Sequence, residues 1–83
     1  MDLLYFARIR ETIGQSGEVL TLPDNISTVD GLINLLRKKG AHYEAAFDND
    51  ALIRVAVNQS YVDFNHPVTT DDEVAFFPPM TGG

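Results

Sequence analysis

The stretch 28-TVDGLINLLRKKG-40 decides the fold class, because it carries the clearest helical pattern in the chain. Its large apolar residues recur at the i, i+3, i+4 and i+7 spacing that places them on one face of a helix. These residues are Val29, Leu32, Ile33 and Leu36. Ser27 or Thr28 is suited to cap the helix start, since its side-chain oxygen accepts a free backbone N–H. Gly40 is typical of the left-handed residue that ends many helices.

Short segments with strand-forming residues lie on both sides of this helix. Before it, residues 3–10 and 18–22 are rich in β-favouring residues, and the turn sequence GQSG at 14–17 separates them. They predict an opening hairpin with a wide connection. After the helix, Tyr43, Ala46 and Phe47 indicate one more apolar turn.

The second half of the chain predicts three more strands. Residues 52–57 form the first, residues 58–60 turn the chain into a short strand at 61–62, and residues 73–77 form the last, which Pro78 ends. This order predicts an α+β domain with one mixed sheet and one main helix packed on one face. A ubiquitin-like β-grasp domain has the same order. We expect this domain to span residues 1–77 and to be followed by an extended, flexible tail at 78–83.

Composition excludes several classes of function. The 83 residues include no cysteine, which removes disulfides, thiolate nucleophiles and cysteine metal sites, and the net charge of −6 disfavours nucleic acid and anionic lipid. No apolar run is long enough for a membrane span, so we expect a cytoplasmic protein. The histidines His42 and His66 lie far apart, and the acidic run 71–73 is best explained as a turn before a strand. We therefore expect no metal or cofactor on this chain.

The last strand is expected to present one aromatic ring to each face of the sheet. Alternation along 73–77 turns Phe76 towards the core and Phe77 away from it. Phe77 is then either covered by the tail or a loop, or exposed as an anchor for a partner protein. Arg8, Arg10 and Arg54, which we place in strands, are expected to surround it.

The C-terminal stretch 76-FFPPMTGG-83 has the features of a working tail. Pro78 and Pro79 favour an extended chain, and the six residues from Pro78 onward reach roughly 19 Å. Met80 and Thr81 then span the entrance of a partner, and Gly82 and Gly83 lack Cβ atoms and fit a narrow channel. The reactive group at the tip is the Gly83 α-carboxylate. It is ionised and a poor electrophile at neutral pH, so it requires activation, for which adenylation by a partner that uses Mg-ATP is suitable.

The motifs YFARIRE, VNQSYV, HPVT and DDEVAFFPPMTGG together resemble the MoaD family, the small sulfur-carrying subunits of molybdopterin synthase. The resemblance implies a β-grasp carrier whose Gly83 is adenylated by an E1-like enzyme and converted to a thiocarboxylate by a sulfur donor. It further implies that the tail inserts into the large synthase subunit of a heterotetramer and that its sulfur passes to cyclic pyranopterin monophosphate. On this view the chain is a non-catalytic sulfur-donor subunit, and the catalytic residues belong to the large subunit.

The same resemblance implies partner-binding roles for three residues. Phe77 and Arg10 match interface positions of the family, whereas Tyr61 falls where relatives often carry leucine and Met80 where valine is common. Two alternatives remain open at this point. One is a sulfur carrier for thiamine thiazole synthesis, and the other is a non-catalytic ubiquitin-like interaction module with an inert tail.

Overall fold

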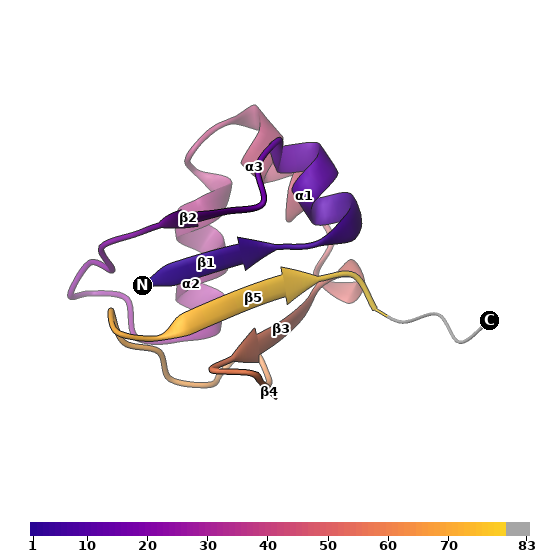
Figure 1. The fold of residues 1–83 in the computed structure, drawn as a ribbon. Helices are drawn as coiled ribbons and strands as arrows, with labels where there is room; N and C mark the ends of the chain where they lie inside the picture. Colours follow the sequence, from indigo (N-terminus) through magenta and orange to yellow (C-terminus); the bar gives the residue numbers. More distant parts are fainter. Residues whose placement is uncertain (80–83) are drawn as a thin grey trace.

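The computed structural model describes residues 1–79, which form a five-stranded sheet with helices on one of its faces (Figure 1). The strand order is β2-β1-β5-β3-β4. The strands are β1 (Asp2–Tyr5), β2 (Gly17–Val19), β3 (Arg54–Val57), β4 (Ser60–Tyr61) and β5 (Glu73–Phe77). The helices are α1 (Ala7–Ile13), α2 (Val29–Arg37), α3 (Ala41–Ala46) and the 3-10 turn η1 (Asp50–Leu52).

The sheet is mixed, because its two central strands are parallel. β1 pairs with β5 in parallel register, with Tyr5 opposite Phe76, whereas the other neighbouring strands pair antiparallel. Parallel strands end at the same edge of a sheet. The chain therefore enters α1 and leaves β5 towards Pro78 at one edge, as Figure 1 shows. The predicted α+β class with a mixed sheet and a ubiquitin-like β-grasp arrangement is confirmed.

α2 is the main helix, as its sequence pattern predicts. The Thr28 Oγ1 accepts the Gly31 N–H at 3.2 Å and so caps the helix start. The four apolar residues of the predicted stripe are all fully buried. The prediction for Gly40 is wrong, however, because α2 ends at Arg37 and Gly40 precedes α3 with a backbone (φ 158°, ψ 175°) outside the left-handed helical conformation.

The segment after β1 corrects the predicted strand over residues 3–10. β1 ends at Tyr5, and Ala7–Ile13 form α1. The residues of α1 include good helix formers, and its apolar residues Ile9 and Ile13 are spaced i, i+4, so that both contact the core. Gly14 ends the helix in the left-handed conformation (φ 93°), and its N–H donates to the Arg10 carbonyl at 2.8 Å.

Two strands also differ from expectation, whereas a smaller helix agrees with it. β2 covers only Gly17–Val19, so the predicted strand at 18–22 is shorter in the structure. A Cβ on Gly17 would lie 2.6 Å from the Leu3 carbonyl oxygen, which restricts this position to glycine. β3 begins at Arg54 rather than at residue 52, because η1 precedes it. The apolar turn predicted around residues 43–47 is confirmed as α3.

The core lies between the sheet and the helices and is centred on aromatic rings. Phe76 and Phe47 are fully buried, and their rings meet edge to face with centroids 5.1 Å apart. Tyr5 stacks beside Phe76 at 6.4 Å. The prediction that Phe76 faces the core is therefore confirmed. This packing leaves the opposite face of the sheet without a covering layer of helices in Figure 1.

Candidate functional site

The open face of the sheet, opposite the helices, carries the candidate site. Along β5, Val74 and Phe76 are buried, and the alternation turns Ala75 and Phe77 to the other face. Residues that pair across strands share a face of the sheet. The strand register therefore adds the partners of Ala75 and Phe77 and of their neighbours to this face: Leu4, Arg54, Ala56 and Tyr61.

Phe77 is half-buried, and the Tyr61 ring covers part of it. The two ring centroids lie 5.5 Å apart, with the planes tilted by 46°. Tyr61 itself is 83% exposed. The turn before β4 sets this contact, because Asn58 (φ 50°) and Gln59 (φ 71°) adopt left-handed conformations that fold the chain back beside β3. Phe77 thus faces away from the core, as predicted, and a neighbouring side chain rather than a loop shields it.

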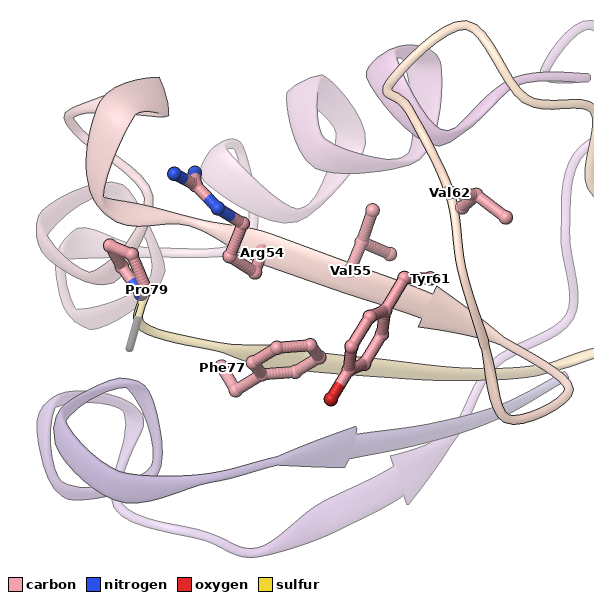
Figure 2. A pocket seen from close by; sticks show the side chains of 6 residues that line it. All are labelled: Arg54, Val55, Tyr61, Val62, Phe77 and Pro79. Carbon is pink, nitrogen blue, oxygen red and sulfur yellow. The ribbon is translucent and has the colours of Figure 1, made fainter. Parts of the chain in front are cut away.

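A groove of about 310 Å³ lies beside this aromatic pair, and we call it the Phe77 groove. Its lining residues are Arg54, Val55, Tyr61, Val62, Phe77 and Pro79. Figure 2 shows the rings of Phe77 and Tyr61 next to each other, with Arg54 and Pro79 on the side away from Tyr61. Because Pro79 is a lining residue, the tail begins at the groove. An apolar hollow beside exposed aromatic surface is the kind of site that receives a side chain of a partner protein.

The remaining predicted site residues are distributed around this edge. Arg10 lies in the last turn of α1, where it is exposed, rather than in a strand, and it does not line the Phe77 groove. Arg8 is likewise in α1, so the prediction that both arginines lie in strands is wrong. Pro78 is half-buried. The predicted roles of Met80, Thr81, Gly82 and Gly83 lie outside the described residues.

Sequence reasoning missed two residues of this region. Phe6 is 45% exposed, and its extended backbone continues β1, so alternation turns its ring to the same face as Phe77. The signal was present, because Leu3 and Tyr5 alternate with Leu4 and Phe6 in the sequence. Val62 was assigned to a strand but not to a site, since nothing in its local sequence shows that it lies next to Phe77 in space.

A second cluster of polar groups lies on the helix side of the sheet, around Glu18. The Glu18 Oε2 accepts hydrogen bonds from the Tyr43 hydroxyl at 2.6 Å and the Tyr5 hydroxyl at 2.8 Å, and Gln15 Nε2 donates to it at 3.1 Å. Lys39 forms an ion pair with Oε1. Every group in this Glu18 cluster is engaged within the domain, which favours a structural role.

The pKa directions in the Glu18 cluster agree with that role. Burial alone would raise the pKa of Glu18, but the hydrogen bonds from Lys39, Tyr43 and Tyr5 outweigh it, and the pKa lies below its ordinary value. The hydrogen bond to Glu18 raises the pKa of Lys39. Burial, followed by Glu18, raises the pKa of both tyrosines. All four groups are thus held more firmly in the charge states they have at neutral pH.

The described part of the chain gives little indication of other chemistry. Within residues 1–79, no three His, Asp or Glu side chains are grouped so that they would hold a metal ion. Among the helices of the same residues, none combines the length and apolar character that crossing a bilayer requires. The open face with its groove is therefore the candidate functional site.

Comparison with known proteins identifies the family. The model of the ThiS family matches residues 3–83. The sulfur carrier subunit of molybdopterin synthase from Escherichia coli is 38% identical over 83 residues, which cover 100% of this chain and 99% of that protein. A putative molybdopterin converting factor subunit 1 from Pyrococcus furiosus has the same fold, with a TM-score of 0.77, 31% identity and 95% coverage of each chain.

One solved structure similar to this chain includes a second subunit. It is a complex of subunits 1 and 2 of the molybdopterin-converting factor from Helicobacter pylori, and the matching chain has a TM-score of 0.64 at 19% identity, covering 99% of this chain and 96% of that one. At that identity the likeness concerns the fold. The family match and the relative from Escherichia coli both extend over nearly the whole sequence. The chain therefore belongs to the ThiS family and, within it, to the sulfur carrier subunits of molybdopterin synthase.

Proposed function

We propose that this carrier holds its sulfur as a thiocarboxylate on Gly83. An E1-like enzyme transfers AMP from Mg-ATP to the Gly83 carboxylate and releases pyrophosphate. A sulfur donor then displaces AMP, which leaves a C-terminal thiocarboxylate. Adenylation is required because an ionised carboxylate is a poor electrophile at neutral pH. The chain supplies the carried group, whereas the nucleotide site and the sulfur donor belong to its partners.

The charged tail then delivers its sulfur inside the large subunit of the synthase. The acceptor is cyclic pyranopterin monophosphate, and two charged carriers complete one dithiolene, after which each tail ends in a carboxylate again. Met80 and Thr81 span the entrance, and Gly82 allows the tip to pass a narrow channel. In the assembled synthase, a small subunit lies at each end of a dimer of large subunits. The complex of subunits 1 and 2 from Helicobacter pylori supports such a partner.

Docking occurs through the open face of the sheet. The observation that carries this proposal is that Pro79, the last described residue before the tip, lines the same groove as Phe77 and Tyr61. A protein that receives the tail must therefore approach over this groove. Apolar and aromatic groups at the centre of an interface supply much of its binding energy, and the net charge of −6 favours a partner with a basic docking surface.

Deletion of Gly83 tests the proposal directly. We expect the shortened chain to keep its thermal unfolding temperature and its binding to the large subunit, but to lose sulfur transfer completely. The assay mixes carrier, large subunit, E1-like enzyme, Mg-ATP, a sulfide source and cyclic pyranopterin monophosphate and measures molybdopterin. A matched control is Lys38→Glu, which alters an exposed side chain at the end of α2 and should leave the assay unchanged. Formation of molybdopterin at the normal rate by the shortened chain would refute the proposal.

Two other functions are separated by further measurements. A carrier for thiazole synthesis uses the same tail chemistry, but it would co-purify with a different large partner. An interaction module with an inert tail would show neither adenylation nor the mass change for replacement of one oxygen by sulfur in protein made in its native host. The match to a molybdopterin synthase carrier over the whole chain favours the first function.

A further inference from the structure

Arg54, like Arg8 and Arg10 in α1, has no acidic partner within residues 1–79, but of these three arginines Arg54 alone lines the Phe77 groove. Within residues 1–79 the ion pairs are Arg37 with Asp50 and Lys39 with Glu18. Arg54 is exposed at the start of β3, where its Nη1 donates to the Ile53 carbonyl at 3.0 Å. A guanidinium has five N–H donors arranged in a planar fork that fits a carboxylate. Most of these donors therefore remain available at the rim of the Phe77 groove.

Two carboxylates close to Arg54 do not use these donors. Arg54 also lines a neighbouring cavity of about 330 Å³, to which Asp50 and Asp63 contribute. Asp50 is bound to Arg37, and Asp63 is exposed. Neither lies within ion-pair distance of Arg54 in the described part of the chain. Arg54 thus provides a positive charge beside an apolar groove in a protein whose net charge is −6.

We propose that Arg54 forms an ion pair with a carboxylate of the large synthase subunit, and that an apolar side chain next to this carboxylate occupies the Phe77 groove. This inference rests on the proposed function, because it takes the protein that receives the tail as the occupant. The groove suits the apolar side chain, since the rings of Phe77 and Tyr61 line it on the open face of the sheet. The pairing of carboxylate with guanidinium then fixes the register in which the partner lies.

Arg54 determines specificity on this proposal. A partner complementary to the net charge of this chain has a docking surface that is basic overall. An acidic group opposite Arg54 would therefore be a negatively charged point on a positively charged surface. A protein without that group would cover Arg54 and remove its water without replacing the lost hydrogen bonds, which weakens binding. A second copy of this chain is a poor occupant, because two copies with a net charge of −6 repel each other.

The test measures binding of two Arg54 variants to the large subunit by titration calorimetry. We expect Arg54→Glu to weaken binding roughly tenfold or more, and Arg54→Ala to weaken it by a smaller factor. Lys38→Glu is the matched control, because it makes the same change of charge at the end of α2, on the helix side of the sheet, and should bind like the unmodified chain. Thermal unfolding of each variant identifies any loss of folded protein. A scan of carboxylate-to-lysine changes in the large subunit should then find one that restores binding of Arg54→Glu.

The outcomes separate this inference from the proposed function. Equal binding by Arg54→Glu and Lys38→Glu would overturn the role of Arg54. Loss of binding by Phe77→Ala in the same experiment would still support the proposal that the large subunit docks over the groove. Absence of binding by the unmodified chain would overturn both. Sedimentation of the unmodified chain as a dimer that Arg54→Glu dissociates would show that a second copy occupies the groove, and would likewise overturn the inference.

Discussion

Ala7 has a backbone conformation that residues with a Cβ rarely adopt. Its φ of 52° lies in the left-handed region, at the point where β1 has ended and α1 begins. The side chain is exposed, so its methyl group makes little packing contribution. Glycine adopts this conformation without the steric cost. We expect Ala7→Gly to raise the free energy of unfolding by up to about 1 kcal/mol in urea denaturation.

The same substitution at Ala45 provides the control for Ala7→Gly. Ala45 is also exposed, but it lies inside α3, and it is not among the described residues with positive φ. Glycine in a helix interior costs about 1 kcal/mol relative to alanine. Ala45→Gly should therefore lower the free energy of unfolding. If both substitutions changed the free energy of unfolding in the same direction, the explanation from backbone strain at Ala7 would be contradicted.

Individual residues of the site were predictable from the sequence where a strand pattern determines the direction of a side chain. Alternation along residues 73–77 placed Phe76 in the core and turned Phe77 away from it, and the structure agrees. Arg10 was misplaced because its segment was interpreted as a strand. The shielding of Phe77 by Tyr61 was not predictable, because the two rings come from strands that are not neighbours in the sheet.

At the scale of elements, the Glu18 cluster joins segments that are far apart in the sequence. Glu18 in β2 accepts hydrogen bonds from Tyr5 in β1 and from Tyr43 in α3, and Lys39 binds it from the connection between α2 and α3. Only 17% of the Glu18 side chain is exposed. Hydrogen bonds to a charged group in such a position contribute more than those between neutral groups. The cluster therefore holds the β2 edge of the sheet to the helical layer.

The cluster makes stability depend on pH in a defined direction. The folded state holds the pKa of Glu18 below its ordinary value of 4.5, so the folded state binds this proton less readily than the unfolded chain does. The resulting stability is present above pH 4.5 and is lost as pH falls through the folded-state pKa. Glu18→Gln should lower the free energy of unfolding by roughly 2 kcal/mol at pH 7, and the difference from the unmodified chain should shrink in acid.

Glu44→Gln is the control for the Glu18 cluster. Glu44 is exposed on α3, and its side chain takes part in no ion pair among residues 1–79. Urea denaturation of the unmodified chain and both variants, repeated between neutral and acidic pH, measures the difference. We expect Glu44→Gln to follow the unmodified chain at every pH. A stability gap for Glu18→Gln that stays constant into acid would show that the carboxylate charge is not the cause.

Elements differed in how well the sequence predicted them. α2 was predictable because its apolar stripe, its cap at Thr28 and its charged ends all favour the same helix. α1 was not, because its seven residues are few for a helix to form by itself, and its contact with α3 and the core stabilises it. Local β-propensity dominated the prediction there, whereas tertiary packing determined the structure.

At the scale of the whole molecule, the mixed sheet was predictable but its strand order was not. The order of helices and strands along the chain leaves few compact arrangements, which is why the α+β class could be predicted. The central pair, however, joins β1 at the start of the chain to β5 near its end. No local signal specifies such a distant pairing. The groove depends on another pairing between strands, since Phe77 and Arg54 come together only when β5 lies beside β3.

On the proposed function, the two faces of β5 have different tasks, because one packs in the core and the other docks on the large subunit. Two neighbouring residues of β5 test this division. Phe76 is fully buried, whereas Phe77 is half-buried and lines the groove. Phe76→Ala should lower the free energy of unfolding by about 3–5 kcal/mol, and Phe76→Leu, with a smaller loss, keeps the test valid if the alanine variant does not fold.

Phe77→Ala should cost only about 1 kcal/mol of stability, because part of its ring already contacts water. It should nevertheless weaken binding to the large subunit by far more than Phe76→Leu does, since aromatic anchors supply a large share of the binding energy of an interface. Urea denaturation and titration calorimetry on the same preparations measure both quantities. Equal effects of the two positions on binding would mean that loss of fold, and not loss of a docking contact, explains the Phe77 variant. If each face of β5 has its own task, Phe77→Ala should affect binding more and Phe76→Leu should affect stability more. The ring of Phe76 then influences binding only through the stability of the sheet.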